Sequence, residues 1–547
     1  MALKLTFPSL IIDSIEKNRN RPALALVGET PITYAEMHSR INSVMAFLEK
    51  LGIGKNDKVA ILSTNMPHWG IAYFSVVFTG AVVVPLLPDF SNDEIKNTLK
   101  HSGAKAVFVS KGLISKLPER GIPALKYKIA IENFELAGSD GIRFEHGEKP
   151  KKKYIIEEDD LAAIIYTSGT TGKSKGVMLT HKNICFNAVK SRTIQTILNT
   201  DRFLSVLPLS HTYENTIGFV LPLINGASVY YLDKTPSPSV LIPALQKVKP
   251  TVMLTVPLII EKIYKSKVLP AFKESKILNK LYGYTLTRKI LNRKAGKKLM
   301  KTFGGELKFF GIGGAKLNEE VEKFLIEAKF PYAIGYGLTE TAPLLAGFGP
   351  FKGKLQSAGK ALEGVQLKIH NPDKESGEGE IRAKGDNVMK GYYKEPSLTK
   401  QVITPDGWFC TGDLGIIDED GFLFIKGRLK NVIIGSGGEN IYPEEIESVI
   451  NNFKHVVESI VIEQKGKLVA LVHFDRDDIK RKYNEIKEGI VDIETKCKEI
   501  VNELKDFVNS KVNRFSRISK VEPHKEEFVK TATKKIKRFL YKKEKEV

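Results

Sequence analysis

Short runs of Val, Ile and Leu alternate with helix-length amphipathic stretches through roughly the first 430 residues. Buried parallel strands read as continuous apolar runs joined by helices, so this pattern predicts a series of βα units. One predicted helix begins at Thr33, where Glu36 completes a capping-box pattern, and ends at Gly52. The predicted strands are VAILS at 59–63, AVVVPL at 81–86, AVFVS at 106–110, AAIIYTS at 162–168 and TVMLTV at 251–256.

The pattern changes twice towards the C-terminus. Residues from about 360 to 430 have the spacing of short strands and turns, which predicts a small β-rich subdomain. From about residue 431 a separate α+β piece begins, with a strand-like segment at SIVIEQKGKLVALVHF. A chain of 547 residues is too long for one hydrophobic core. We therefore expect an α/β protein with a large N-terminal domain of βα layers over 1–430 and a small C-terminal domain over 431–547.

Cysteine usage and hydropathy exclude several classes of protein. The three cysteines, Cys185, Cys410 and Cys497, are far apart and form no CxxC pair, which argues against a disulfide framework or a zinc ribbon and favours a reducing compartment. The first residues lack the pattern of a signal peptide. The uncharged run from Ile71 to Asp89 is better explained by a buried helix followed by a buried strand than by a membrane span, because Gly80 divides it.

The formal net charge of +21 favours anionic ligands, a membrane surface or nucleic acid. Zinc-finger spacing and RNP-type aromatic motifs are both missing from the sequence, so we expect no nucleic-acid partner. Residues 273–302 contain ten Lys or Arg and one acidic residue, with apolar residues at helical spacing. They predict a basic amphipathic helix pair, which is either a solvated surface element with one face packed on the body or a patch that docks on a membrane.

The most informative motif is YTSGTTGKSKG, from Tyr166 to Gly176, directly after a predicted strand. Glycines and hydroxyl residues interleaved in a loop leave backbone N–H groups and hydroxyls free to surround phosphate oxygens, and Lys173 and Lys175 add positive charge. The motif is not a Walker A loop, because that pattern needs a glycine where this chain has Thr167.

This loop resembles the phosphate loop of the adenylate-forming superfamily, which includes acyl-CoA synthetases, peptide-synthetase adenylation domains and luciferases. Other stretches similar to that family follow in its order over nearly the whole chain. They are TYAEM at 33–37, GAVVVPL at 80–86, LPLSHTYE at 207–214, GIGGAKL at 311–317, YGLTET at 336–341, GEGEIRAKG at 377–385, TGDLG at 411–415, GRLKNVIIGSGGENIYPEEIE at 427–447 and TATKKIKR at 531–538.

The resemblance implies an ATP site built from these motifs. It assigns Mg²⁺ to Glu340 with Ser168 nearby, which suits a hard cation on phosphate oxygens. It assigns the ribose hydroxyls to Asp413 and Arg428, and the adenine to small residues with Tyr336 stacked on its face. The loop residues implied are Thr167, Ser168, Gly169, Thr170, Thr171, Gly172 and Lys173, and the remaining nucleotide contacts are Gly313, Gly314, Ala315, Gly337 and Thr339.

The same resemblance implies a catalytic lysine and a moving C-terminal domain. Alignment on the closing motif favours Lys535 as the lysine that bridges the acyl carboxylate and the α-phosphate, with Lys534 as an alternative. His211 matches a region that lines the acyl pocket. Lys430 matches the hinge about which the C-terminal domain turns between the two half-reactions. Gly437, Gly438 and Glu439 are then expected beside the incoming thiol.

Within the superfamily the chain looks most like long-chain fatty-acid–CoA ligases, on LPLSHTYENTIGFVLPLINGA, VPLIIEKIYKS and the basic helical insertion. The expected substrates and cofactors are a fatty acid, ATP, Mg²⁺ and coenzyme A. Transfer to an acyl carrier protein, which the basic surface also suits, and a non-catalytic lipid- or nucleotide-binding protein are the alternatives. We expect a cytoplasmic protein, with peripheral contact at the inner membrane face through residues 273–302 as a further hypothesis.

Overall fold

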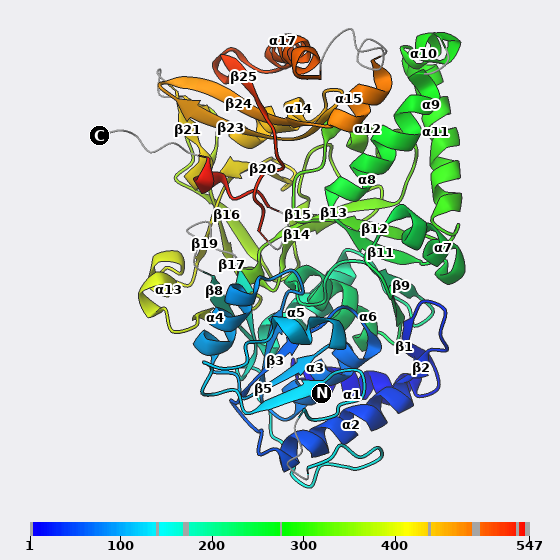
Figure 1. The fold of residues 1–547 in the computed structure, drawn as a ribbon, viewed down its shortest axis with the longest axis vertical. Helices are drawn as coiled ribbons and strands as arrows, with labels where there is room; N and C mark the ends of the chain where they lie inside the picture. The colour runs from blue at the N-terminus through cyan, green and yellow to red at the C-terminus, as the bar shows by residue number, and fades with distance from the viewer. Residues whose placement is uncertain are drawn as a thin grey trace.

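The computed structural model describes residues 4–137, 142–167, 174–273, 276–435, 439–483, 493–531 and 535–541. It has the α/β architecture that the sequence predicts, with two large sheets, a smaller four-stranded sheet and a C-terminal segment with a sheet of its own. Figure 1 shows the C-terminal segment, in orange and red, above the two large sheets, with the yellow strands of the small sheet to one side.

The two large sheets are mainly parallel, as βα units require. The first has the strand order β15 (Lys360–Ala361), β14 (Leu344–Phe348), β13 (Tyr332–Gly337), β12 (Phe309–Ile312), β11 (Val252–Thr255), β9 (Arg202–Ser205), β10 (Ser228–Tyr231), β1 (Pro22–Leu26) and β2 (Ile32–Thr33). The second has the order β18 (Gly391–Tyr392), β8 (Lys175–Thr180), β7 (Leu161–Thr167), β4 (Val82–Leu86), β3 (Lys58–Leu62), β5 (Ala106–Val109) and β6 (Tyr127–Ala130).

Antiparallel pairs make up most of the smaller sheets. The four-stranded sheet, in the predicted β-rich region, has the order β16 (Gln366–His370), β17 (Gly379–Lys384), β19 (Phe409–Ile417) and β20 (Leu423–Arg428). The C-terminal segment contains the pair β21 (Ile433–Ile434) and β22 (Asn440–Ile441) and the sheet β23 (Val456–Gln464), β24 (Lys467–Phe474) and β25 (Lys520–His524). The single strand-like segment predicted at 459–474 is therefore a hairpin, which turns at Lys465 and Gly466.

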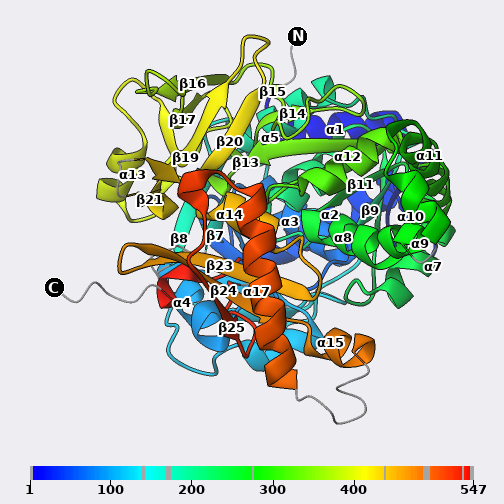
Figure 2. The ribbon, with the colours of Figure 1, turned by 90° about the horizontal axis from the view of Figure 1, so that it is seen from above.

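The helices cover the sheets and connect their strands (Figure 2). Those of the first half are α1 (Phe7–Asn18), α2 (Tyr34–Lys50), α3 (Pro67–Phe78), α4 (Asn92–Ser102), α5 (His181–Lys190), α6 (Leu221–Ile224), α7 (Pro238–Val248), α8 (Pro257–Ile263) and α9 (Leu269–Lys273). The others are α10 (Lys276–Tyr282), α11 (Thr285–Thr302), α12 (Glu319–Glu327), α13 (Pro396–Val402), α14 (Pro443–Ile450), α15 (Arg476–Lys482) and α17 (Ile493–Lys511).

Several local predictions are confirmed within a residue or two. Thr33 caps α2 and forms the expected capping box with Glu36. All five predicted strands are present, as β3, β4, β5, β7 and β11. The basic stretch forms the helix pair α10 and α11. None of the helices in the described ranges combines the length and the apolar character that a membrane span requires.

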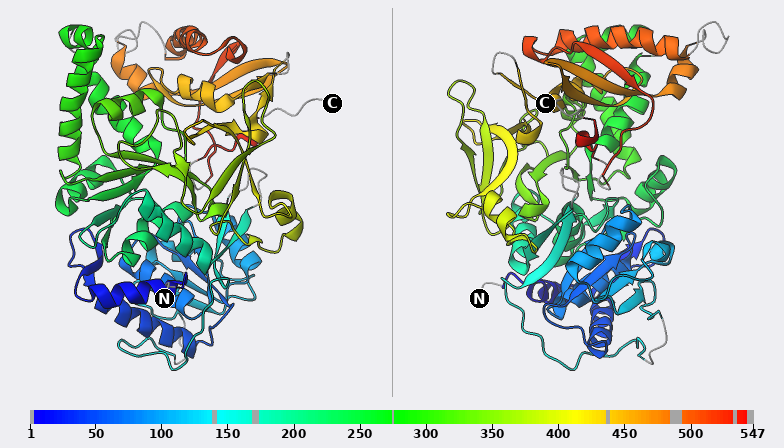
Figure 3. Two further views of the ribbon diagram at one scale, coloured as in Figure 1. Left: turned by 180° about the vertical axis from the view of Figure 1, so that it is seen from behind. Right: turned by 60° about the vertical axis from the view of Figure 1, so that its left-hand side comes forward.

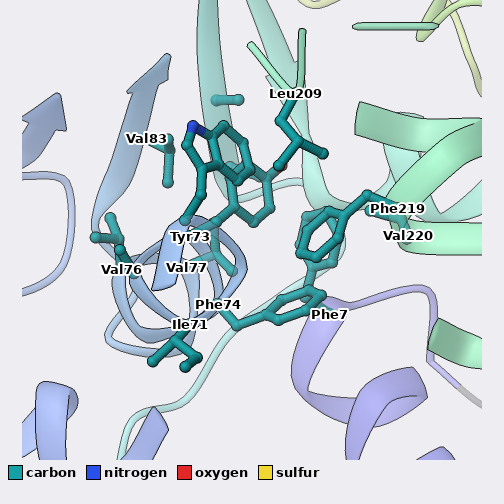
Figure 4. Packing of buried hydrophobic residues seen from close by; sticks show 14 of the residues in the cluster. Phe7, Ile71, Tyr73, Phe74, Val76, Val77, Val83, Leu209, Phe219 and Val220 are labelled. Atoms are coloured by element: carbon teal, nitrogen blue, oxygen red, sulfur yellow. The ribbon is translucent and has the colours of Figure 1, made fainter. Parts of the chain in front are cut away.

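The uncharged run at 71–89 forms helix α3 followed by strand β4, as predicted, and α3 is buried between the two large sheets. Its aromatic side chains pack against residues from other elements (Figure 4). Phe74 stacks on Phe219 with ring centroids 4.9 Å apart, and Tyr73 meets Phe7 edge-on at 5.6 Å. Gly70 permits this contact, because a Cβ there would lie 2.7 Å from the Phe219 ring. This aromatic layer joins the sheets into one body.

Phe219 lies on η3, a π-helical stretch from Glu214 to Val220 that is buried throughout. Glu214 begins this stretch with a side chain that is only 1% exposed. One of its carboxyl oxygens has no hydrogen-bond partner among the described residues, and Ser205 is close to the group. Burial raises the pKa of Glu214 to about 8. The carboxyl group is therefore mostly protonated at neutral pH.

The C-terminal segment has its own hydrophobic core, built from α14, α17 and the sheet β23–β24–β25. Cys497 is part of this core and Cys185 part of the main one, and neither forms a disulfide. The segment also contacts the main body through polar groups, including an ion pair of 3.3 Å between Lys511 and Glu320. The boundary at Lys430 stays a prediction.

Replacing Phe219 with Ala is expected to lower the free energy of unfolding by about 3–5 kcal/mol, because it leaves a cavity between the sheets. The measurement is the denaturant midpoint and slope. Phe351→Ala, at a side chain that is 70% exposed, is the control and should change stability by less than about 0.5 kcal/mol. Equal effects of the two substitutions would show that the aromatic layer does not hold the sheets together.

Glu214 is expected to make the protein less stable as pH rises from about 5 to about 8. An unfolded carboxyl releases its proton near the ordinary pKa of 4.5, whereas the folded group keeps it up to about 8. The folded state binds the extra proton over this range, so the free energy of unfolding falls as pH rises. Glu214→Gln should flatten this slope, measured by denaturant unfolding across the range. Glu16→Gln, at an exposed position, should leave the slope as it is, and a Glu214→Gln slope equal to that of the wild type would contradict the assignment.

Candidate functional site

The predicted phosphate loop connects two strands of the seven-stranded sheet. Thr167 ends β7 and pairs with Lys175 at the start of β8, and the two strands run antiparallel. The predicted contacts from Ser168 to Lys173, including the proposed second magnesium ligand Ser168, lie outside the described residues. The base of the loop is held by Tyr393, whose backbone N–H donates to the carbonyl of Gly176 at 2.7 Å.

Glu340 lies beside the base of this loop, on the short helix η5 (Thr339–Thr341) that follows β13. The hydroxyl of Tyr392 donates to its Oε1 at 2.8 Å, and the Lys175 ammonium lies 5.2 Å from the centre of the same tyrosine ring. Thr339 and Gly337 are on the same turn. Tyr392 therefore connects Lys175, at the base of the loop, with Glu340. No motif in the sequence predicts this role for Tyr392.

Asp413, Arg428 and Tyr336 form one polar cluster from two sheets, in which Asp413 and Tyr336 are buried and Arg428 is exposed. Asp413 and Arg428 are direct cross-strand neighbours on β19 and β20, with Arg428 Nε 3.2 Å from Asp413 Oδ1. The Tyr336 hydroxyl, at the end of β13, donates to Asp413 Oδ2 at 2.8 Å. Asp413 is only 5% exposed, so burial raises its pKa, while Arg428 and the tyrosine hydroxyl act in the opposite direction. The sequence interpretation assigned the tyrosine only a stacking role.

The predicted adenine contacts lie at the carboxyl ends of adjacent parallel strands. Gly313, Gly314 and Ala315 follow β12, next to the end of β13 that holds Tyr336. Crevices at this edge of a parallel sheet are the usual ligand sites of open α/β folds. Gly313 is buried against the ring of Tyr213, which a Cβ would approach to 3.2 Å, whereas Gly314 and Ala315 are exposed. Backbone at this position is therefore open to a flat ligand.

The closing part of the C-terminal segment, in red, runs down from its own sheet towards the large sheets (Figures 1 and 3), and this part of the chain contains Lys535. Its backbone is fixed by Thr531, whose N–H donates to the Lys535 carbonyl at 2.7 Å. The side chain is open to solvent, yet partial desolvation and the charge of Arg428 lower its pKa, while Asp413 and Glu340 act in the opposite direction. The lysine thus lies within electrostatic reach of the three residues assigned to ATP and magnesium. Lys534 lies outside the described residues.

His211 is half-buried at the start of the segment that leads into η3. Burial lowers its pKa to about 4, and the charge of Lys535 acts in the same direction. The Tyr213 backbone N–H donates to His211 Nδ1 at 3.3 Å. The imidazole is therefore neutral at neutral pH and acts through hydrogen bonding rather than charge.

An apolar cavity begins beside these residues. Tyr213, Gly311 and Gly335 contribute to it, and they adjoin His211, Gly313 and Tyr336 in the chain. Ser191, Gln195 and Tyr213 supply the polar groups of a lining that is otherwise apolar, and none of the described residues that line it is cationic. The full lining is Ser191, Ile194, Gln195, Ile197, Phe203, Tyr213, Ile217, Leu221, Val252, Leu254, Phe309, Gly311, Ala333, Ile334, Gly335, Leu344 and Phe348.

Lys430 and Glu439 lie where the C-terminal segment leaves the four-stranded sheet. Lys430 is exposed on η6 (Leu429–Asn431), directly after β20. Glu439 accepts a hydrogen bond from the Gly435 backbone N–H at 2.9 Å, which closes the turn between β21 and β22. Gly437 and Gly438 lie outside the described residues. The hinge and thiol-side roles of these four residues stay predictions.

Comparisons with known proteins identify the family to which the chain belongs. The family profile for the AMP-binding enzyme matches residues 12–393. The long-chain-fatty-acid–CoA ligase heimdall of Drosophila melanogaster is 30% identical over 517 residues, which cover 84% of this chain and 74% of that protein. The 4-coumarate–CoA ligase 1 of Solanum tuberosum is 30% identical over 543 residues, covering 94% and 90%.

Solved structures give the same result. The o-succinylbenzoate CoA synthetase of Bacillus subtilis, in complex with its acyl-adenylate intermediate, superposes with a TM-score of 0.78 at 25% identity over 98% of both chains. The same enzyme in complex with ATP and a magnesium ion gives a TM-score of 0.77 at 25% identity, over 97% of this chain and 98% of that one. On the match of the family profile and the coverage of these relatives, the chain belongs to the AMP-binding enzyme family, with the adenylate-forming architecture of its acid–CoA ligases.

Proposed function

We propose that the protein is a long-chain fatty-acid–CoA ligase that works in two steps. In the first, a carboxylate oxygen of the acid bonds to the α-phosphorus of ATP while the bond to pyrophosphate breaks, which gives acyl-AMP. In the second, the sulfur of CoA bonds to the acyl carbon, the bond to AMP breaks and the thiol proton leaves to solvent. The observation that carries the proposal is the apolar cavity lined in part by Tyr213, close in the chain to His211, on which the charge of Lys535 acts.

The first step brings a carboxylate onto a triphosphate, so positive charge and positioning are the main requirements. Lys535 supplies a mobile cation between the two anions. Tyr336 and Arg428 orient the buried carboxylate of Asp413, which leaves lone pairs on both oxygens to accept the ribose hydroxyls.

Magnesium and CoA fit the residues present. Tyr392 holds one oxygen of Glu340 and leaves the other without a hydrogen bond from the described residues, which suits a hard cation. Bound there with ATP, magnesium would neutralise phosphate charge. Lys430 would serve as the hinge, and the loop that contains Glu439 would face the thiol of CoA in the second step.

The cavity favours a fatty acid over the ring acids of some relatives. Its lining is aliphatic and aromatic, and it offers no cation to a second carboxylate. One wall of the cavity contains Gly311, Ala333 and Gly335. Their side chains are no larger than a methyl group, so this wall leaves room for a ligand. A hydrocarbon chain would gain roughly 0.8 kcal/mol per buried methylene in such a site.

Lys535→Ala is expected to slow acyl-AMP formation by about 10²–10³-fold, because it removes the cation aimed at the developing charge. Acid-dependent pyrophosphate release measures this step. Transfer of a preformed acyl-AMP to CoA should change far less, since the lysine serves the first step. In the wild type, the alkaline limb of the first step should lie below the ordinary lysine range, because the charged form is lost as pH rises through a lowered pKa.

Two neighbouring lysines are controls for this prediction. Lys534→Ala and Lys537→Ala should each retain pyrophosphate release within about three-fold of the wild type, because neither lysine is the one assigned to the α-phosphate. A strong loss in Lys534→Ala with little change in Lys535→Ala would reverse the assignment. Loss of both half-reactions in Lys535→Ala would point to misfolding of the C-terminal segment instead.

Pyrophosphate release should peak at long-chain acids when a panel from acetate to oleate and 4-coumarate is tested with ATP, Mg²⁺ and CoA. The physical reason is the apolar lining, which rewards each added methylene. A peak at aryl acids would overturn the substrate assignment but keep the ligase. Release without CoA consumption would favour the carrier protein as acceptor, and no release with any acid would contradict an enzyme.

Ala333→Leu tests whether the cavity is the acyl site. The larger side chain shortens the cavity, so kcat/KM for oleate should fall about ten-fold or more relative to a short acid. Ala361→Leu, at an exposed position on the edge strand β15 of the same sheet, is the matched control and should leave the ratio unchanged. An unchanged ratio in Ala333→Leu would exclude this cavity.

A further inference from the structure

The α10–α11 helix pair exposes large apolar side chains among basic ones. Ile277 is 73% exposed on α10, Tyr284 is 60% exposed at the turn, and on α11 Leu286 and Ile290 are 79% and 53% exposed. Scattered apolar residues are normal on a protein surface, but these four lie within fourteen residues on one helical hairpin. Helices α10 and α11 lie along one side of the molecule, with α10 at its upper end in Figure 1.

Helix α11, on which Leu286 and Ile290 are exposed, is held firmly against the body. Arg288 and Asn292 both bond to Glu327 of α12, with Arg288 Nη2 2.8 Å from Glu327 Oε1 and Asn292 Nδ2 2.7 Å from Oε2. Gly296 allows close packing there, because a Cβ would lie 2.5 Å from the carbonyl oxygen of Ala328. One face of α11 is therefore fixed against the body, and the opposite face is fixed towards solvent.

That solvent face contains a row at i, i+4 spacing in which apolar residues are followed by basic ones. Leu286 and Ile290 come first, then Lys294 and Lys298, and all four are exposed. Residues at this spacing lie one above another on a helix. The row thus presents an apolar end close to the hairpin turn and a cationic end behind it, so the turn can enter a headgroup region while the lysines meet lipid phosphates.

The positive charge of helices α10 and α11 favours an anionic partner. Ten basic residues and one acidic residue between 273 and 302 account for +9 of the chain's net +21. Arg288 is paired with Glu327, whereas the exposed lysines of α11 form no ion pair with any residue that the structure describes. About 1 kcal/mol per basic side chain is the usual attraction of such clusters to an anionic lipid surface.

We propose that α10 and α11 dock the protein on an anionic phospholipid surface, with Ile277, Tyr284, Leu286 and Ile290 in the headgroup region and the lysines of α11 against lipid phosphates. An acidic carrier protein fits less well. Such a partner must deliver its thiol near the turn between β21 and β22, which lies on the other side of the molecule from α10 and α11 (Figures 1 and 2). The proposed function explains why docking would be useful, because long-chain acids concentrate in membranes. The docking surface itself is inferred independently of that function.

The test is sedimentation of the full-length protein with vesicles, without acid, ATP or CoA. We expect binding to vesicles of equal parts phosphatidylcholine and phosphatidylglycerol, little binding to phosphatidylcholine alone, and a decrease as salt is added. Lys294→Glu with Lys298→Glu should weaken partitioning about ten-fold or more. Leu286→Ser with Ile290→Ser should also weaken it, and this loss should persist in high salt.

The matched control is Lys96→Glu with Lys100→Glu, an exposed pair at the same spacing on α4, which should bind vesicles as the wild type does. Pyrophosphate release from detergent-dispersed acid should be equal in all these proteins, which shows that each is folded. If the control pair lost vesicle binding equally, net charge alone would explain the effect and the proposal would be overturned. Vesicle binding at the wild-type level by both α11 variants would also overturn it. Loss of binding to an acidic carrier protein with unchanged vesicle binding would favour that partner. Failure to bind vesicles would leave the ligase assignment untouched.

Discussion

The buried carboxylate of Asp413 connects three parts of the chain that fold on different sheets. Tyr336 bonds to it from the nine-stranded sheet, Arg428 pairs with it within the four-stranded sheet, and the charge of Lys535 acts on it from the C-terminal segment. A buried charge without partners costs several kcal/mol, so these contacts fix the ends of β13, β19 and β20 against one another. The positions of the adenine-side glycines and of Glu340 depend on this junction, because both follow strands of the same sheet edge.

Local structure and the order of the motifs were largely predictable from the sequence. The capping box of α2, the strand β4 after a buried α3 and the basic pair α10–α11 follow from side-chain periodicity over a few residues. The cross-strand pair of Asp413 and Arg428 places together two residues that the resemblance had assigned to one function. The hairpin β23–β24 was the local error, since an apolar run with a Lys-Gly turn inside it reads as one strand.

The parts that the sequence could not predict depend on contacts between distant segments. Tyr392 supports Glu340 from a strand on the other large sheet, and nothing near either residue in the sequence indicates this. The cavity lining is drawn from residues 191 to 348, so its shape exists only after the nine-stranded sheet, the segment that follows α5 and the π-helical stretch have packed. Glu214 is a further example, because a carboxyl group in an apolar stretch gives no local sign that it will be left with an unpaired oxygen.

Two of the ion pairs between the C-terminal segment and the body lie at the surface, as the proposed turn of the segment between the two steps requires. Lys511 pairs with Glu320 at 3.3 Å and Lys316 with Glu445 at 3.9 Å, and all four side chains are more than a third exposed. Pairs of this kind contribute about 0–1 kcal/mol each. The segment has its own core, so it can leave this arrangement without unfolding. The charge of Lys535 therefore acts on Asp413 from a segment with its own core, whereas Asp413 and Tyr336 are buried in the body, and the proposed two-step reaction requires this difference.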